Sequence, residues 1–183
     1  GLRSESMHRS HMLEYARSKG ATTMTVVDAD EIWDPNSLEA SLRAVETANR
    51  AGRWLARFHN FWRSWGWTVK DAFRPVRIVD LRHSLGNDAY LDDQMQPLPV
   101  YHFGYAQTLE TMRYKFSCHG HKAEFKPGWF ESKFVPWTPA GPHDDLPPCV
   151  NNLWTTEPTD APTLAKVRDL LTGHPHADLE VIA

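Results

Sequence analysis

The stretch Met24–Glu31 reads Met-Thr-Val-Val-Asp-Ala-Asp-Glu, and its two halves differ in character. The first half is apolar and β-branched, which is typical of a buried strand in a parallel sheet. The second half is acidic, and it places Asp28 and Asp30 one residue apart, directly after the apolar run. The stretch therefore predicts a strand that ends at an acidic turn.

Helices are predicted on both sides of this strand. Over residues 4–19, apolar and aromatic side chains recur at three- and four-residue spacing, and Gly20 follows where a helix would stop. On the other side, Asp34 can cap a helix that has Pro35 at its first position and runs to about residue 50. The order helix, strand, helix indicates an α/β fold.

The rest of the chain predicts further strands, two loops and two more helices. Residues 54–81 contain alternating and β-rich segments, which suit strands that extend the sheet in antiparallel fashion. Residues 83–99 are polar and contain glycine and proline, so we expect a loop there. Helices are predicted over residues 108–116 and 162–172, and the proline-containing residues 135–162 should form an extended surface segment.

Composition narrows the class of protein. The chain has 183 residues, a formal net charge of −3 and no run of like charges, so its charge as a whole gives no attraction to a polyanion. No stretch approaches the ~20 apolar residues that cross a bilayer. Cys118 and Cys149 have no second cysteine near either, which suits neither a disulfide framework nor a Cys-rich zinc site. We expect a soluble, cytoplasmic protein.

The acidic turn is the candidate site. In an α/β sheet, ligands bind at the carboxyl ends of strands. In extended geometry Asp28 and Asp30 would point the same way, with Ala29 packed against the sheet. Mg²⁺ and Mn²⁺ prefer carboxylate oxygens and keep other positions for water and phosphate. The turn is therefore predicted to bind a divalent cation and a diphosphate. The plain alternative is that these acids only stabilise the N-terminus of the next helix.

At these residues the chain resembles the GT-A class of glycosyltransferases, specifically its family-two-like enzymes. The similarity includes Arg9–Trp33, where a helix and a strand lead into Asp-x-Asp, and Val100–Ala106, which reads Val-Tyr-His-Phe-Gly-Tyr-Ala. It covers residues 5–50 and 98–135. The resemblance implies a Rossmann-like mixed α/β sheet flanked by helices. It also implies metal-dependent transfer of a sugar from a nucleotide-sugar to a hydroxyl acceptor.

The resemblance also implies roles for individual residues. Asp28 and Asp30 would hold Mn²⁺ or Mg²⁺ against the diphosphate of the nucleotide-sugar. His102 lies in the second similar segment and would complete the metal site. Lys115 belongs to the helix that follows His102, and it is a candidate for binding the donor.

Other candidates come from the chemistry of the reaction. An inverting transfer needs a carboxylate that deprotonates the acceptor hydroxyl. Asp92 and Asp93 are the candidates, with Asp71 as a further one, because all three lie between the two similar segments. His119 and His121 could contact the diphosphate. Two alternative interpretations of His119 and His121 remain. They could bind a zinc ion, although no matching ligand cluster lies nearby in sequence, or they could belong to a surface loop without such a role.

Arginines and tryptophans are interleaved between Arg53 and Arg82, and they do not decide which kind of molecule is the acceptor. They would suit charge and stacking contacts with a nucleic acid, and the same aromatic rings would suit a glycan or a small molecule. They equally suit arginine stems that cover an aromatic surface. The eight tryptophans of the chain are explained more simply as core residues than as a ligand wall.

The resemblance departs from the GT-A pattern at its start. Only 27 residues precede Asp28, whereas GT-A domains have base-binding strands before the Asp-x-Asp motif. We therefore expect residues 1–134 to form a partial catalytic domain, with its first part supplied by a longer polypeptide or by a second chain. Residues 135–183 would form an extended C-terminal segment with a short helix packed on it.

Two rival functions fit parts of the pattern. A phosphatase of the haloacid-dehalogenase type also opens with an apolar strand and Asp-x-Asp. In that case Asp28 would be the nucleophile, Asp30 the general acid, and Asp92 and Asp93 a metal pair. The second rival is a non-catalytic module that binds a glycan or a partner through its tryptophans. Release of phosphate from a phosphomonoester would favour the first, and no heat with Mn²⁺ and nucleotide diphosphates would favour the second.

Overall fold

A computed structural model describes most of the chain. The described residues are 2–48, 52–70, 73–82, 93–118, 125–144, 146, 154–174 and 177, with the side chains of residues 2–6 and 93–97 left aside.

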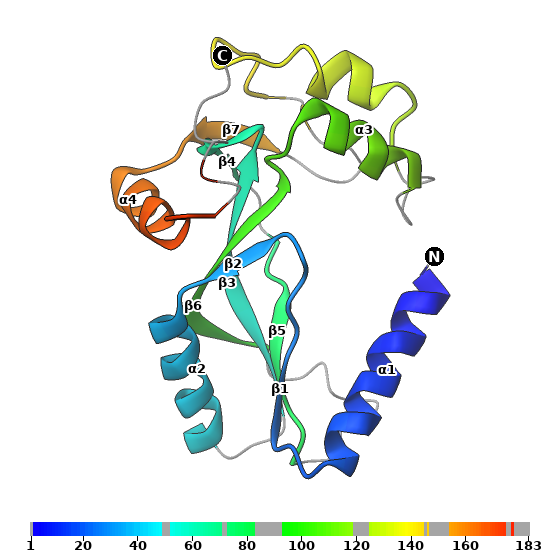
Figure 1. Cartoon of the computed structure of the whole chain (residues 1–183), viewed down its shortest axis with the longest axis vertical. Coiled ribbons are helices and arrows are strands. Elements are labelled where there is room, and N and C mark those ends of the chain that lie inside the picture. Colours follow the sequence, from blue (N-terminus) through cyan, green and yellow to red (C-terminus); the bar gives the residue numbers. More distant parts are fainter. Residues whose placement is uncertain are drawn as a thin grey trace. The chain divides into compact units, whose positions relative to one another are not determined.

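Helices and strands alternate irregularly along the described chain (Figure 1). In chain order they are α1 (Leu2–Ser18), β1 (Thr23–Thr25), β2 (Glu31–Trp33), α2 (Pro35–Ala48), β3 (Arg53–Trp62), β4 (Ser64–Lys70), β5 (Val76–Asp80), β6 (Asp93–Tyr105), α3 (Leu109–Cys118), the π-helical turn η2 (Phe130–Phe134), β7 (Thr155–Pro158) and α4 (Ala161–Leu170). All four predicted helices are present. Their local signals are confirmed, because α1 is followed by Gly20 at φ 75° and α2 begins at Pro35, directly after Asp34.

The sheet is mostly antiparallel, so the prediction of a Rossmann-like GT-A sheet is wrong. The strand order is β1-β5-β3-β4-β7, with β6 paired to β2 and β3. Each neighbouring pair along that order is antiparallel where its register is described. Of the predicted strand Met24–Val27, only Met24 and Thr25 belong to β1, a short strand at the end of the order, and Val27 beyond it is 59% exposed. β-branched residues favour a strand, but they do not determine its direction or its place in the sheet.

The loop predicted over residues 83–99 is also corrected. Residues 93–99 belong to β6, which begins at Asp93 and includes two prolines. Proline removes one ladder hydrogen bond, which an edge position or a bulge tolerates, so it weakened the sequence signal without preventing a strand. Residues 83–92 lie outside the described residues.

The chain divides into two compact units, each with its own core. The first unit consists of residues 1–58 and 73–101, and the second consists of residues 59–72 and 102–183. The division falls inside β3 and β6, which therefore contribute residues to both. The functional division expected after residue 134 stays a prediction.

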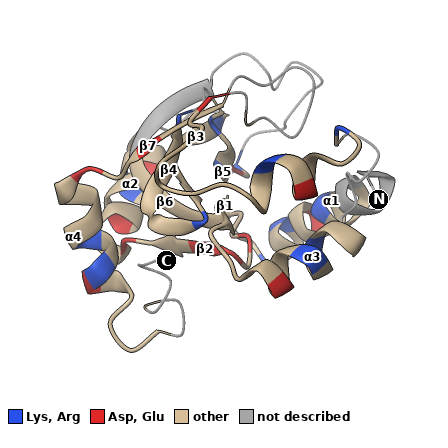
Figure 2. Ribbon diagram, turned by 90° about the horizontal axis from the view of Figure 1, so that it is seen from above, with Lys and Arg blue, Asp and Glu red and all other residues tan. Residues whose placement is uncertain are grey.

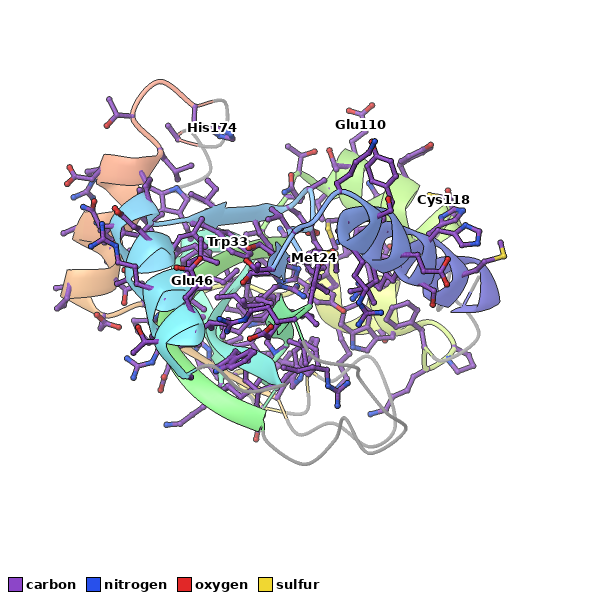
Figure 3. All side chains as sticks on the ribbon, turned by 90° about the horizontal axis from the view of Figure 1, so that it is seen from below. Met24, Trp33, Glu46, Glu110, Cys118 and His174 are labelled. Carbon is purple, nitrogen blue, oxygen red and sulfur yellow. The ribbon has the colours of Figure 1, made fainter. Side chains whose placement is uncertain are left out.

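The core of the first unit packs α2 against strands. Its buried side chains are Val45, Trp54, Ala56, Ile78, Leu98 and Val100. Trp33, labelled in Figure 3, packs against this cluster from β2. The start of α2 is fixed by Asp34, whose Oδ2 accepts a hydrogen bond of 2.8 Å from the Ser37 hydroxyl and whose carbonyl accepts the first helical bond from Leu38.

The core of the second unit is aromatic and centres on Trp62. Five rings lie with their centroids 5.1–6.3 Å from its ring, those of Tyr105, Trp129, Phe134, Trp137 and Trp154. All eight tryptophans are described, and six of them are buried, while Trp33 and Trp67 are half-buried. The core interpretation of the tryptophans is thus confirmed, because few of their rings have a surface on which a ligand could stack.

The four helices α1, α2, α3 and α4 each contain both acidic and basic residues (Figure 2). Within the described ranges, none of the helices combines the length and the hydropathy that crossing a bilayer requires. Cys118, labelled in Figure 3 at the end of α3, is an exposed free thiol, and Cys149 lies outside the described residues.

Candidate functional site: an acidic turn on a buried ion pair

Residues Asp28–Glu31 form a hydrogen-bonded turn between β1 and β2. The amide of Glu31 donates to the carbonyl of Asp28 at 3.2 Å, and the amide of Asp28 donates to Oε2 of Glu31 at 3.3 Å. Ala29 is exposed at the turn instead of packing on the sheet. The expected extended geometry is therefore wrong, because the Glu31 carboxylate satisfies the Asp28 amide locally and leaves it no need of a strand partner.

Beneath this turn lies a buried ion pair between Glu31 and Arg77. The Glu31 side chain is fully buried and accepts hydrogen bonds from Arg77 and, at 3.1 Å, from the indole N–H of Trp33. Burial raises the pKa of Glu31, while the hydrogen bond and the charge of Arg77 oppose that rise. The Arg77 side chain is 6% exposed, and its guanidinium carbon lies 5.5 Å from the Phe58 ring centroid. A positive charge buried in this way requires an acidic partner.

Arg77 connects the ion pair to the acidic turn. Its Nη2 also donates to Oδ2 of Asp28 at 2.7 Å, so a single guanidinium holds both carboxylates. The Asp28 side chain remains 41% exposed, and Arg9 lies with its Nη2 3.9 Å from Oδ1 of Asp28. Asp30, two residues further along the turn, is half-buried. The turn thus contains the Asp28 carboxylate, which Arg77 holds in place, and the Asp30 carboxylate two residues further along the chain.

Sequence reasoning missed the part that Arg77 plays. It grouped Arg77 with the arginines that could contact an acceptor, although this residue stands among the apolar residues Val76, Ile78 and Val79 of β5. A basic residue inside an apolar strand is a usable signal, because buried charges require a partner. The identity of the partner was not readable, since Arg77 and Asp28 are 49 residues apart in sequence.

The donor set of the turn fits a hard divalent cation. Carboxylate oxygens are the ligands that Mg²⁺ and Mn²⁺ prefer, and Mg²⁺ is usually held by one or two carboxylates plus water and phosphate. Across the described residues, no group of three or more His, Cys, Asp or Glu side chains is arranged to hold a metal ion. Asp28 and Asp30 supply the type of ligand that such a cation accepts, and their joint binding of a cation stays a prediction, while Glu31 is paired with Arg77.

Neither unit is assigned to a family by similarity. The chain matches no protein-family model, no curated protein and no solved structure. The likeness to glycosyltransferases stays a resemblance, and function is inferred from the acidic turn and its ion pairs.

His102 lies in the second unit, on β6. Its Nδ1 is 2.9 Å from Oδ1 of Asn60, a buried residue of β3. Because an amide oxygen can only accept, Nδ1 is the donor, and in the neutral ring Nε2 carries the lone pair. A histidine that binds a metal is typically oriented in this way, with its other N–H bonded to an oxygen. Asp28 and Asp30 belong to the first unit, so the shared metal site stays a prediction.

Gly104 makes room for the His102 ring. A Cβ at position 104 would come within 2.2 Å of Cε1 and 2.5 Å of Nε2 of His102. The variant Gly104→Ala should therefore push the ring away from Asn60 and cost about 1 kcal/mol of unfolding free energy, the worth of one hydrogen bond. Urea denaturation can check this in the single variants Gly104→Ala and His102→Ala and in the double variant. In the His102→Ala background, Gly104→Ala should add almost nothing. Additive costs would contradict this close packing.

Lys115 fastens α3 to the end of β6. Its Nζ donates to the carbonyl of Gly104 at 3.0 Å and lies 6.0 Å from the Tyr105 ring centroid. The described contacts are thus structural, and its role in binding the donor stays a prediction.

The remaining predicted residues fall where little is described. Asp71, Asp92, His119 and His121 lie outside the described residues, and of Asp93 only the backbone at the start of β6 is described. Their catalytic and donor-binding roles stay predictions.

Proposed function

We propose that this chain is part of a glycosyltransferase that takes a sugar from a nucleotide-sugar and uses Mn²⁺ or Mg²⁺ held by Asp28 and Asp30. The observation that carries the proposal is a turn with two carboxylates one residue apart, fixed by hydrogen bonds to Glu31 and Arg77. A carboxylate that is already oriented loses little conformational freedom when a cation binds, so the turn is pre-organised for that ligand.

The exposed Arg9 beside the acidic turn supports a ligand that carries both a positive and a negative charge, while the buried Arg77 stays paired with Asp28 and Glu31. Arg9 approaches Asp28 from α1 with an exposed side chain, and Arg77 approaches from β5. Guanidinium groups bind phosphate oxygens well, and carboxylates bind the cation that accompanies a diphosphate. A metal-bound nucleoside diphosphate would pair with both the acids and the exposed Arg9, whereas a metal ion alone would pair only with the acids.

When bound, the divalent cation supplies charge neutralisation for the leaving nucleoside diphosphate. The residues of the chain have separate tasks. Arg77 and Glu31 orient Asp28, and Asp28 and Asp30 bind the cation. Deprotonation of the acceptor hydroxyl would fall to Asp92 or Asp93, which stays a prediction. The acceptor is a hydroxyl of a glycan, a small molecule or a nucleic acid.

The rival functions gain less support. A binding module that uses its tryptophans needs exposed rings, and six of the eight are buried. For a phosphatase, Asp28 would have to act as a nucleophile while it is bound to the Arg77 guanidinium. Assays for phosphate release from a phosphomonoester and for nucleoside diphosphate release from a nucleotide-sugar separate these chemistries.

The proposal predicts cooperative binding of Mn²⁺ and a nucleotide-sugar. Calorimetry with uridine- and guanosine-based nucleotide-sugars should give heat only when Mn²⁺ is present, together with a rise in melting temperature by mass action. Asp28→Asn and Asp30→Asn should each weaken Mn²⁺ binding by about tenfold or more. Asp169→Asn, which changes an exposed acid on α4, is the matched control and should bind as the wild type does. Equal Mn²⁺ binding by the wild type and the double variant of the turn would sink the proposal.

A further inference from the structure

Arg63 is a buried arginine, and no acidic side chain among the described residues forms an ion pair with it. It occupies the turn between β3 and β4, it is 7% exposed, and its Nε has no hydrogen-bond partner in the described part of the chain. Its guanidinium lies over the Phe134 ring, 5.1 Å from the ring centroid. Burial lowers the pKa of Arg63, but an arginine side chain keeps its proton in a protein. A charge in such surroundings is normally balanced by an anion.

The backbone at Arg63 gives an independent reason to expect a role for its side chain. Arg63 has φ 61°, a left-handed conformation that glycine adopts without steric cost and other residues adopt rarely. The connection is tight, since Trp62 pairs directly with Ser64, and the Arg63 amide donates to the carbonyl of Tyr105 at 2.9 Å. A glycine would serve the turn better, so the turn does not explain why an arginine stands there.

Two further hydrogen-bond donors belong to the same aromatic cluster. The indole N–H groups of Trp62 and Trp137 are buried and have no partner among the described residues. The Trp62 ring centroid lies 5.1 Å from that of Phe134 and 6.2 Å from that of Trp137. The cluster thus combines a cation with buried N–H donors, and an oxyanion is the ligand that accepts from both kinds of group.

We propose that Arg63 anchors an oxyanion-binding site in the second unit, which takes a phosphate or carboxylate group with help from the indole N–H groups of Trp62 and Trp137. The planar guanidinium can give two parallel hydrogen bonds to either group, and it does so with little loss of conformational freedom because the turn and the Phe134 ring already fix it. All of these residues belong to the second unit, and the site needs no metal ion.

Nuclear magnetic resonance on the ¹⁵N-labelled chain tests the site directly. Sodium phosphate and, separately, sodium acetate are titrated without metal or nucleotide, and chloride keeps the ionic strength constant. The expected result is a saturable shift of the Arg63 Nε–H signal and of the Trp62 or Trp137 indole signal. A response to phosphate alone identifies a phosphate site, a response to acetate alone identifies a carboxylate site, and responses to both identify a general oxyanion site.

Variants decide whether Arg63 is the anchor. Arg63→Lys keeps the charge but loses the planar fork, and it should bind the responding anion about tenfold more weakly. Arg168→Gln is the matched control, because Arg168 also lies over a ring, 5.6 Å from the Trp65 centroid, but is exposed. It should bind as the wild type does.

Absence of a saturable shift with either anion would overturn the proposal and leave Arg63 as a cation held only by Phe134. Unchanged affinity in Arg63→Lys and Arg63→Gln would overturn it as well, and if Arg63→Gln does not fold, Arg63→Lys decides alone. Because the titration contains no metal ion, its failure would say nothing about the proposed transferase function. Failure of Mn²⁺ and nucleotide-sugar binding would likewise say nothing about the oxyanion site.

Discussion

Replacing Arg77 with methionine is expected to lower the free energy of unfolding by about 3–5 kcal/mol, because it leaves a fully buried carboxylate without its counter-charge. The Glu31 side chain has no solvent exposure, and its main partner is the Arg77 guanidinium. Methionine fills a similar volume, so the loss should come from the charge and not from a cavity. Denaturation by urea at neutral pH measures the difference from the wild type.

The double variant Glu31→Gln with Arg77→Met is the control for this result. It removes both charges, and replacing a whole buried pair costs far less than breaking it. It should therefore recover much of the stability that Arg77→Met loses. If Arg77→Met loses less than about 1 kcal/mol, the ion pair is not buried in the way described, since even one orphaned charged group costs more than that.

The loss in Arg77→Met should also depend on pH. Burial raises the pKa of Glu31 above its usual value of 4.5, and the charge and hydrogen bond of Arg77 hold that rise back. For a carboxyl whose pKa is raised in the folded state, the associated stability is present below the unfolded pKa and is lost as pH rises through the folded pKa. Without Arg77 the folded pKa rises further, so the deficit should be largest at neutral pH and should shrink as pH falls through the folded pKa values of the variant and the wild type, both of which lie above 4.5. A deficit that does not change with pH would contradict the assignment to Glu31.

Truncating Trp62 to alanine should lower the stability of the second unit by about 3–5 kcal/mol, as expected for a large aromatic residue removed from a packed core. Trp62 has no exposed surface and contacts five other rings, which no rearrangement of a single neighbour could replace. Chemical denaturation followed by far-ultraviolet circular dichroism measures the loss.

Trp67→Ala is the matched comparison for Trp62→Ala. Trp67 lies on β4 in the same unit, but it is half-buried and packs at the margin of the cluster, stacked on His143 with ring centroids 4.9 Å apart. Its truncation exposes the space to solvent and should cost clearly less. Equal losses in the two variants would show that Trp62 is not the centre of this core.

Helices of this chain were predictable because their signals are local. Asp34 and Pro35 stand side by side at the start of α2, and Gly20 follows α1 in the left-handed conformation that glycine favours. The direction of the strands was not predictable in the same way. The run from Met24 to Val27 predicts a strand, and Met24 and Thr25 do belong to β1, but its partner β5 lies some fifty residues further along, and an apolar run fits either direction of pairing.

Part of the candidate site was predictable from the sequence because part of its signal is also local. Asp28 and Asp30 are adjacent enough in sequence to be recognised as a pair, whereas their local geometry depends on Glu31 bonding back to the Asp28 amide. The contacts of Arg77 with Asp28 and of His102 with Asn60 join residues 49 and 42 positions apart. Such contacts arise from the pairing of strands, which no local pattern fixes.

The most direct test of the central claim is paramagnetic broadening of backbone amide signals by Mn²⁺. At Mn²⁺ well below the protein concentration, the amides of Ala29, Asp30 and Glu31 should broaden first, and excess Mg²⁺ should restore them. The double variant Asp28→Asn with Asp30→Asn should show no such selectivity. Unbroadened signals from these three residues, or the same broadening in the double variant, would mean that the acidic turn does not hold a divalent cation.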